Sequence, residues 1–253
     1  MKAETDTTKN NEQKIRFLYR LEQKQETRGL YERIFADSPL YVDFYYNEKC
    51  RDNVIVVKEE SPKAAEEGPN GSVKKRGAGG GGLLSMAHLN PYLYSVRGLT
   101  VRVCMIAAVA TVPERRHEGH MRDVLTAAMD WLSEQGVPFA VLLPVDPAIY
   151  RDFGFETVCG FTEKEPPEAE AAKYDIFRIR DLDVQIRQEK EQAVEAALQA
   201  AGEEDEGWPE NPVIMARVTN AEAFDRMAGR TFRDDEARLS WLRGLKICIC
   251  DGV

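Results

Sequence analysis

Residues 101–135, VRVCMIAAVATVPERRHEGHMRDVLTAAMDWLSEQ, contain the pattern that decides the fold. Residues 101–111 form an almost continuous apolar run, which predicts a strand buried on both faces in the middle of a sheet. Residues 119–135 repeat apolar side chains at helical spacing and stop before Gly136, which predicts an amphipathic helix. Residues 139–143 (FAVLL) predict the next buried strand. The order strand, helix, strand indicates an α/β protein with one open, mixed sheet.

Further elements are expected on both sides of this unit. Upstream, the pattern predicts a strand beginning near Ile15, a helix over 26–35, a second helix opened by Ser38 and Pro39, and strands over 53–57 and 83–89. The polar, Gly-rich residues between the last two strands predict a flexible loop over 58–82. Downstream, we expect a strand over 213–218, a helix over 221–227 and a last apolar strand over 245–250.

Composition narrows the class of partner. The 253 residues include 34 Lys+Arg and 43 Asp+Glu, which gives a net charge of −9. Such a surface disfavours nucleic acid and anionic membranes and accommodates a cationic ligand. No apolar run is long enough to span a bilayer, and the polar first residues do not resemble a signal peptide, so the cytoplasm is the expected compartment. The five cysteines are widely spread without a CxxC pair, so neither a disulfide framework nor a zinc site is indicated.

A basic turn joins the central strand to the helix and has the character of an anion site. The first turn of a helix presents unpaired backbone N–H groups and the positive end of the helix dipole. Gly119 lacks a Cβ that would hinder the approach of phosphates, and Arg116 and Arg122 can add charge-assisted bonds. On spacing alone, a well-capped helix with solvated arginines remains an alternative.

The same turn resembles a known signature. Arg116, Gly119 and Met121 are similar to the R-x-x-G-x-G/A motif of the GNAT superfamily of acetyl-CoA-dependent N-acetyltransferases. Residues 15–161 most resemble the enhanced-intracellular-survival-type branch, through YERIFADS, LLSMAHLNPY, AAVATVPERRHEGHM and IYRDFGFE. Residues 213–227 (VIMARVTNAEAFDRM) are similar to the opening of the sterol-carrier-protein-like domain that follows in that branch.

The resemblance implies a GNAT acetyltransferase fold, an α/β architecture with a mixed sheet and a small truncated C-terminal segment. The implied domains are a disordered N-terminus (1–13), the acetyltransferase domain (14–162), an acidic linker (163–211) and a partial sterol-carrier-protein-like segment (212–253).

The resemblance also implies acetyl-CoA as cosubstrate and no metal. The backbone of Val109 and Thr111 would pair with the pantetheine arm as an additional strand does. The diphosphate would be held by Arg116, His117, Glu118, Gly119, His120, Met121 and Arg122. Met121 departs from the general signature, which has Gly or Ala there, so its side chain must point into the core for the turn to remain open.

Acetyl transfer requires a deprotonated amine, a polarised carbonyl and an acid for the departing thiolate. Tyr150 matches the tyrosine that the family places after its fifth strand and is the expected general acid; the alternative is an aromatic residue packed against Phe153 and Phe155. Glu114 is a candidate base, with His88 and Asp146 as further candidates and a chain of waters as a replacement for any of them.

We therefore expect an N-acetyltransferase that moves the acetyl group directly to a primary amine of a cationic small molecule or peptide, with neither nucleic acid nor membrane as partner. One alternative is a non-catalytic module that binds acetyl-CoA as a sensor. Another is an oligomer subunit, since the apolar residues of 213–253 would be exposed in an isolated segment and favour docking or association.

Overall fold

The computed structural model describes residues 14–60, 82–162, 168–171, 173–203 and 210–250. The strands are β1 (Lys14–Leu18), β2 (Val54–Glu59), β3 (Leu83–Val96), β4 (Leu99–Thr111), β5 (Phe139–Leu142), β6 (Glu156–Gly160), β7 (Ile176–Arg178), β8 (Val213–Val218) and β9 (Ile247–Cys248). The helices are α1 (Leu21–Lys24), α2 (Arg28–Phe35), α3 (Pro39–Phe44), α4 (His120–Glu134), α5 (Pro147–Arg151), α6 (Glu168–Ala171), α7 (Leu182–Ala201), α8 (Ala221–Ala228) and α9 (Asp235–Arg243). The short helices are η1 (Gln25–Thr27), the π-helix η2 (Tyr45–Lys49) and η3 (Pro113–Arg115).

One mixed sheet organises these elements. Its strand order is β1-β2-β3-β4-β5-β8-β6, and β7 pairs with both β3 and β9. Along the main path only β4 and β5 run parallel, and every other neighbouring pair is antiparallel. The predicted α/β fold with a mixed sheet is therefore confirmed, and the apolar run 101–111 lies in β4 at the centre of the sheet.

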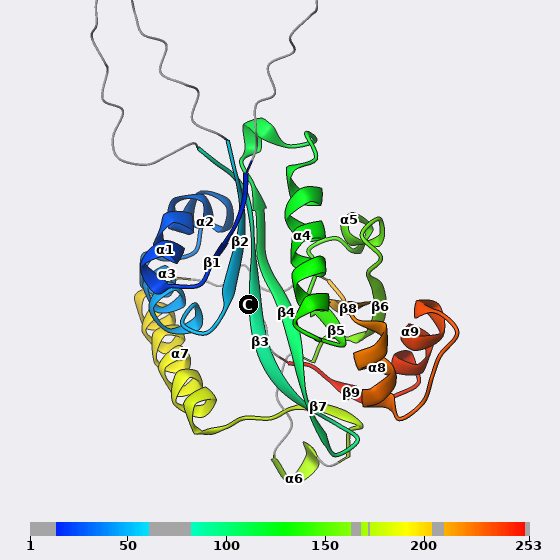
Figure 1. Ribbon diagram of the computed structural model, residues 1–253. Helices are drawn as coiled ribbons and strands as arrows, with labels where there is room; N and C mark the ends of the chain where they lie inside the picture. The colour runs from blue at the N-terminus through cyan, green and yellow to red at the C-terminus, as the bar shows by residue number, and fades with distance from the viewer. Residues whose placement is uncertain (1–13, 61–81, 163–167, 172, 204–209, 251–253) are drawn as a thin grey trace, which may run out of the picture.

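Helices cover both faces of the sheet. Figure 1 shows α1–α3 and α7 on one side of β1–β4 and α4 on the other. The apolar side of α4 packs on β2–β5 through Val124, Leu125, Ala128, Met129 and Leu132. The opposite face of β2–β4 packs against an aromatic cluster from α2, α3 and η2, while α8 and α9 cover the lower part of the sheet. The predicted helices over 119–135 and 26–35 and the helix opened by Pro39 correspond to α4, α2 and α3.

Strand β3 is longer than predicted. It continues from Leu83 through Pro91 to Val96 and forms a long hairpin with β4. Pro91 is tolerated because it lies between the last pair with β2, at Leu89, and the first pair with β7, at Tyr94. A proline removes a backbone N–H, which a strand can lose at an edge but not between two neighbours.

The C-terminal residues belong to the same sheet. Strand β8 lies between β5 and β6, with Phe139 opposite Val218 and Gly160 opposite Val213. The described residues 212–250 of the expected partial sterol-carrier-protein-like segment supply an interior strand and share a core with residues 14–162. An interior strand gains hydrogen-bonded partners on both edges, which a unit of this size would lack alone.

The expected acidic linker over 163–211 also contributes structure. Strand β7 extends the sheet, and helix α7 contacts α3. Ion pairs tie α7 to the protein at Lys49–Glu191, Lys190–Glu48 and Arg187–Asp52, although none of the α7 side chains is buried. The expected disordered residues 1–13 lie outside the described part of the chain, as does most of the predicted loop 58–82; residues 58 and 59 belong to β2.

No helix within the described ranges has both the length and the apolar character needed to cross a bilayer.

Candidate active site

The central strand β4 separates from β5 soon after they meet. The two strands pair only at Cys104–Ala140 and Met105–Val141. From Ile106 onward, no described strand pairs with β4 on this side, while β3 continues to pair on the other side up to Thr111. The N–H and C=O groups along this edge can therefore bond an extended ligand that lies between the separated strands. Val109 and Thr111, the two residues expected to pair with the pantetheine arm, both lie on this stretch.

A β-bulge in β4 accompanies the separation. The register with β3 shifts between Met86 and His88, so that Met86 faces Ala110 and His88 faces Ala107. At the shift, Ala108 has a φ of 46°, a left-handed conformation that is uncommon outside glycine. A bulge inserts one unpaired residue and bends its strand. The bulge thus explains how β4 turns away from β5 where the predicted cofactor residues begin.

The turn between β4 and α4 has the backbone geometry of an anion site. Gly119 is the N-cap of α4 with a φ of 85°, and no side chain caps the first turn. His117 also has a positive φ, of 66°. A Cβ on Gly119 would meet no protein atom within 4 Å, so the glycine is required by its backbone conformation rather than by crowding. The amides of the first turn of α4 are left for a ligand or solvent.

Ion pairs hold this turn in place. Arg115 Nε bonds Glu118 Oε2 at 2.8 Å, and Arg115 Nη1 bonds Glu60 Oε1 at 3.0 Å, which ties the turn to the end of β2. His120 Nε2 lies 3.2 Å from Glu118 Oε2, and His120 is almost fully buried. The Glu118 carboxylate is thus occupied by contacts within the protein, so the predicted diphosphate contact of Glu118 would be made by its backbone.

Two arginines of the turn remain available for phosphate. Arg116 and Arg122 are exposed, and neither forms an ion pair with any described residue. The guanidinium of Arg122 lies over the Phe153 ring, with its carbon 5.0 Å from the ring centroid. Both can add charge-assisted bonds to an anion held by the α4 amides.

The core beneath α4 brings three predicted site residues together. Val109, Met121 and Tyr150 all pack, partly buried, against the same core cluster. The expected inward orientation of Met121 is consistent with this packing. Tyr150 stands in α5 with its ring 6.1 Å from that of Phe155, edge to face, and burial raises the pKa of Tyr150 to about 12.

None of the three candidate bases is well placed for proton removal. Glu114 is exposed and paired with Arg33, whose hydrogen bond lowers the pKa of Glu114. Asp146 caps α5 by accepting the Ala148 N–H at 2.8 Å. His88 is fully buried beside the bulge, its Nδ1 is 2.9 Å from the Tyr45 hydroxyl, and burial lowers the pKa of His88 to about 3.

Two features under the turn are not predicted by the sequence. Lys58 of β2 is buried and pairs with Asp123 in the first turn of α4, which secures the helix N-terminus to the sheet. A lone lysine near the end of a β-branched run gives no signal of this role. The bulge at Ala108 could not be predicted either, because the stretch AAVA (107–110) is uniformly apolar and shows no break in its pattern.

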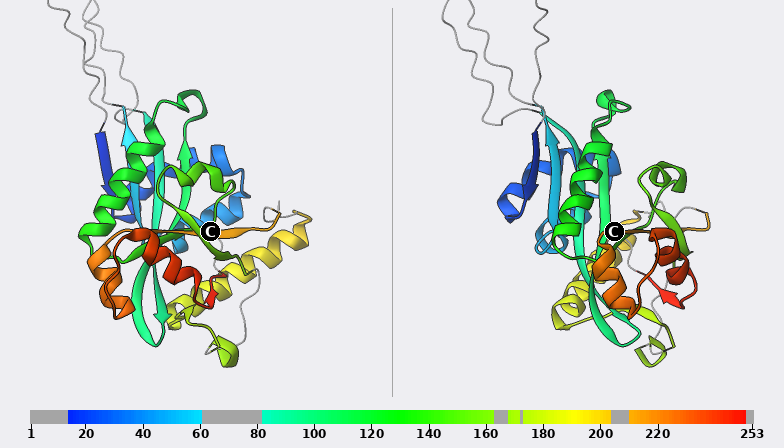
Figure 2. Two further views of the ribbon diagram at one scale, coloured as in Figure 1. Left: turned by 90° about the vertical axis from the view of Figure 1, so that its right-hand side faces the viewer. Right: turned by 45° about the vertical axis from the view of Figure 1, so that its right-hand side comes forward.

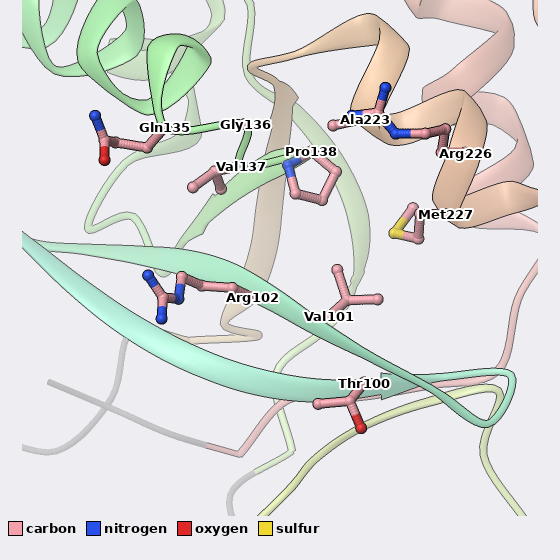
Figure 3. Close-up of a pocket in the computed structure, with 10 residues that line it drawn as sticks. All are labelled: Thr100, Val101, Arg102, Gln135, Gly136, Val137, Pro138, Ala223, Arg226 and Met227. Carbon is pink, nitrogen blue, oxygen red and sulfur yellow. The ribbon is translucent and has the colours of Figure 1, made fainter.

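Two cavities are found on the described surface. One has a volume of about 250 Å³ and is lined by residues of β4, α8 and the α4–β5 connection, including Arg102, Pro138 and Arg226 (Figure 3). It lies at the opposite end of β4 and α4 from the diphosphate turn. The other, of about 420 Å³, lies beside α4, the α5–β6 turn, β8 and α9. Among the described residues no group of three or more His, Cys, Asp or Glu could hold a metal ion.

Comparison with protein families identifies one match. The family described as "Acetyltransferase (GNAT) domain" matches residues 58–158, which span β2 to β6 and include the bulge, the Gly119 turn and Tyr150. No curated protein matches the chain.

Solved structures also resemble the chain. A protein from Enterococcus faecalis V583, described as a probable N-acyltransferase, is 17% identical with a TM-score of 0.47 over 59% of this chain and 33% of its own. Eis1 from Mycobacterium abscessus is 16% identical with a TM-score of 0.42 over 59% of this chain and 32% of its own. The GNAT family N-acetyltransferase YhbS from Escherichia coli, in complex with CoA, is 16% identical with a TM-score of 0.48 over 90% of this chain and 91% of its own. The aligned part of this chain spans about a third of the length of the first two structures.

Proposed function

We propose, from the premise that this chain carries a domain of the GNAT acetyltransferase superfamily, that the protein moves an acetyl group from acetyl-CoA to a primary amine of a cationic acceptor. One observation carries the proposal: the family match covers a bulged, separated edge of β4 that leads directly into a glycine turn at the N-terminus of α4. An extended ligand with a diphosphate at one end fits this arrangement, in which the open backbone edge of β4 is followed by the free first-turn amides of α4.

The residues of this chain fit the parts of acetyl-CoA. The open backbone edge of β4 at Val109 and Thr111 would pair with the amides of the pantetheine arm. The first-turn amides of α4 would hold the diphosphate, and Arg116 and Arg122 would neutralise its charge. When bound, acetyl-CoA supplies a thioester that an amine can attack.

Tyr150 is the proposed general acid. In the transfer, the amine nitrogen forms a bond to the acetyl carbon, the carbon–sulfur bond breaks, and the leaving sulfur takes a proton from the Tyr150 hydroxyl. This phenol is protonated at neutral pH, and burial extends that range by raising its pKa to about 12. The amine loses its protons to solvent, because Glu114, Asp146 and His88 are each held in other contacts, and the Tyr150 phenolate regains a proton from solvent after the thiol leaves.

The acceptor class rests on charge. A net charge of −9 attracts cationic molecules and steers their approach. We therefore propose a polyamine, an aminoglycoside-like amine, a lysine side chain or a peptide N-terminus as the acceptor, and a cytoplasmic setting without nucleic acid or membrane as partner. Association of copies of the chain stays a prediction from the sequence.

The branch within the superfamily is likewise a proposal. The stretches YERIFADS and IYRDFGFE support placement in the enhanced-intracellular-survival-type branch. In this placement residues 212–253 complete the acetyltransferase sheet, since β8 lies between β5 and β6.

A sensor function is the second candidate. It is favoured by the contacts of the three candidate bases, Glu114, Asp146 and His88, since each is held by other groups and is not free to deprotonate an amine. In this alternative the same backbone groups bind acetyl-CoA, and no transfer follows.

Thiol release from acetyl-CoA with a panel of amines separates the two functions. The enzyme predicts amine-dependent release, and the sensor predicts binding without release. Tyr150→Phe should lower kcat far more than it weakens CoA binding, since it removes only the hydroxyl that would donate the proton and keeps the ring. Equal loss of both would contradict the role of Tyr150 as acid.

A further inference from the structure

The β3–β4 hairpin has a second open backbone edge, at the end of β4 that lies away from the Gly119 turn. Strand β4 begins at Leu99, but its pairing with β5 begins only at Cys104, so no described strand pairs with residues 99–103 on that side. Both views of Figure 2 show this end of the hairpin beside α8. A row of unpaired N–H and C=O groups can bond an added strand.

The residues that precede β5 cannot cover this edge. The register of β4 with β5 would place Pro138 opposite Arg102, and a proline has no N–H to donate. The Pro138 carbonyl is used elsewhere, since it accepts the N–H of Thr219 at 3.1 Å. The N–H of Val137 is also bonded, within the turn that ends α4. The cavity of about 250 Å³ therefore separates the α4–β5 connection from this part of β4.

The two faces of the strand differ at this edge. Val101 packs partly buried against the core beneath α8 and α9, and Leu99, on the same face, is 53% exposed. Arg102 lies on the opposite face, is exposed and forms no ion pair with any described residue. Figure 3 shows the Val101 side chain pointing toward Met227 and that of Arg102 pointing away from it. An added strand would meet apolar surface with alternate side chains and a cation with the others.

Charge selects the kind of strand that fits. The described residues that line the cavity include Arg102 and Arg226 and no carboxylate. Arg226 is already paired with Glu222, so Arg102 is the cation that remains for a partner. A second copy of this chain fits less well, because antiparallel pairing of two identical edges would place both copies of Arg102 on one face of the joined sheet. Like charges on neighbouring strands destabilise a pairing.

We propose that residues 99–103 bind an extended acidic segment of another protein as an added strand of the sheet. Its acidic side chains would lie on the face of Arg102 and its apolar side chains on the face of Leu99 and Val101. Main-chain hydrogen bonds would supply affinity, and the alternating side chains would supply specificity. From Val101 to Val109 the strand rises about 27 Å, so the segment and acetyl-CoA would bind independently.

Titration with a short peptide tests the proposal in the absence of CoA. The probe is a fluorescent six-residue peptide that alternates glutamate and valine and is blocked at both ends. The full chain should bind it with a Kd below about 1 mM, and amide hydrogen exchange should slow at residues 99–103. Arg102→Glu should weaken binding about tenfold. Arg20→Glu makes the same change of charge at an exposed position after β1 and should leave the affinity unchanged within about twofold.

Matched peptides show whether the backbone and the charge are recognised. N-methylation of alternate residues gives two peptides, and only the one whose methyl groups face β4 should lose binding, because an added strand pairs through one edge. A peptide that alternates lysine and valine should bind at least about tenfold more weakly.

Several results would overturn the proposal. These are an absence of binding at about 1 mM, equal affinity for the glutamate and lysine peptides, equal loss in both methylated peptides, and slowed exchange only outside residues 99–103. Self-association of the full chain that slows exchange at 99–103 without peptide would assign the edge to a second copy instead. Failure of the proposed acetyl transfer is distinguishable, since it is measured by CoA binding and thiol release and leaves these titrations unaffected.

Discussion

Gly119→Ala tests whether the turn before α4 is the cofactor site. Gly119 has a φ of 85°, and a Cβ placed on it would meet no protein atom within 4 Å. The substitution therefore introduces no clash within the free protein, where its effect comes from the conformational cost of a left-handed backbone. For an L-residue that cost is about 1–2 kcal/mol.

This cost lowers either the stability or the CoA affinity, depending on the conformation that the turn adopts in the free protein. If the turn keeps its conformation without ligand, the free energy of unfolding falls by about 1–2 kcal/mol, equivalent to about 2–8 °C in Tm for a chain of this size. If the turn relaxes instead, stability is preserved and the cost falls on binding, which weakens CoA affinity by about 5–30-fold. The Ala Cβ on the ligand side of the turn adds to the second effect.

The controls separate backbone conformation from binding. Gly98 lies in the β3–β4 hairpin with the same φ of 85° and equally open surroundings, so Gly98→Ala should cost similar stability and leave CoA affinity unchanged. Gly119→Asn should be milder, because Asn adopts this conformation more readily. CoA titration and thermal unfolding of the three variants are the measurements. A Gly119→Ala protein that keeps both its stability and its CoA affinity would refute the reasoning.

Three further predictions concern ionisable groups. Burial raises the pKa of Tyr150 to about 12, so deprotonation of its hydroxyl should not lower kcat between pH 7 and 10. A fall in kcat near pH 8 that Tyr150→Phe abolishes would contradict this prediction. Burial lowers the pKa of His88 from 6.5 to about 3, so between these pH values the unfolded state binds a proton that the folded state does not. The free energy of unfolding should therefore fall as the pH drops from about 7 toward 3, by at most about 1.4 kcal/mol per pH unit. In urea unfolding, His88→Gln should flatten this slope, and an unchanged slope would show that His88 is not its source. Helix α7 buries no side chain, so its ion pairs should hold it against the protein. Glu191→Gln, which removes the pair with Lys49, should speed amide hydrogen exchange across residues 182–201 several-fold, whereas Glu189→Gln, at an exposed position, should not. Equal exchange rates in the two variants would mean that the Lys49–Glu191 pair does not hold the helix.

Local patterning predicted the central part of the fold well. The run 101–111 predicted a strand buried on both faces, which holds for residues 103–108 of β4, and the helical spacing that follows predicted α4 packed against it. The length of β3 could not be predicted, because Asn90 and Pro91 interrupt its pattern and both are accommodated by neighbours distant in the sequence. Asn90 accepts a hydrogen bond from Asn53 at 3.0 Å, and Pro91 occupies a gap between two partner strands.

The backbone part of the candidate site could be predicted, and the side-chain part could not. A glycine at the N-terminus of a helix after a buried strand indicates an anion site whatever surrounds it. Whether a side chain is free to act as a base depends on its tertiary contacts. Only the structure shows that Glu114 is paired with Arg33 on another helix and that His88 is buried beside Tyr45. The bulge at Ala108 depends on register with β3, which a run of small apolar residues leaves open.

The position of β8 changes what a truncation experiment can show. Cutting the chain before residue 213 would be a reasonable test of an interface if the last residues formed a separate unit. They instead place β8 between β5 and β6, so the cut would expose the edges of both strands and remove Ile214, Met215 and Ala216 from the core. Self-association of the shortened chain would then follow from the open edges of the sheet. Substitution of exposed apolar residues in the full chain, beginning with Val145 and Ile149 on and before α5, is the sounder test of association, because the sheet stays closed.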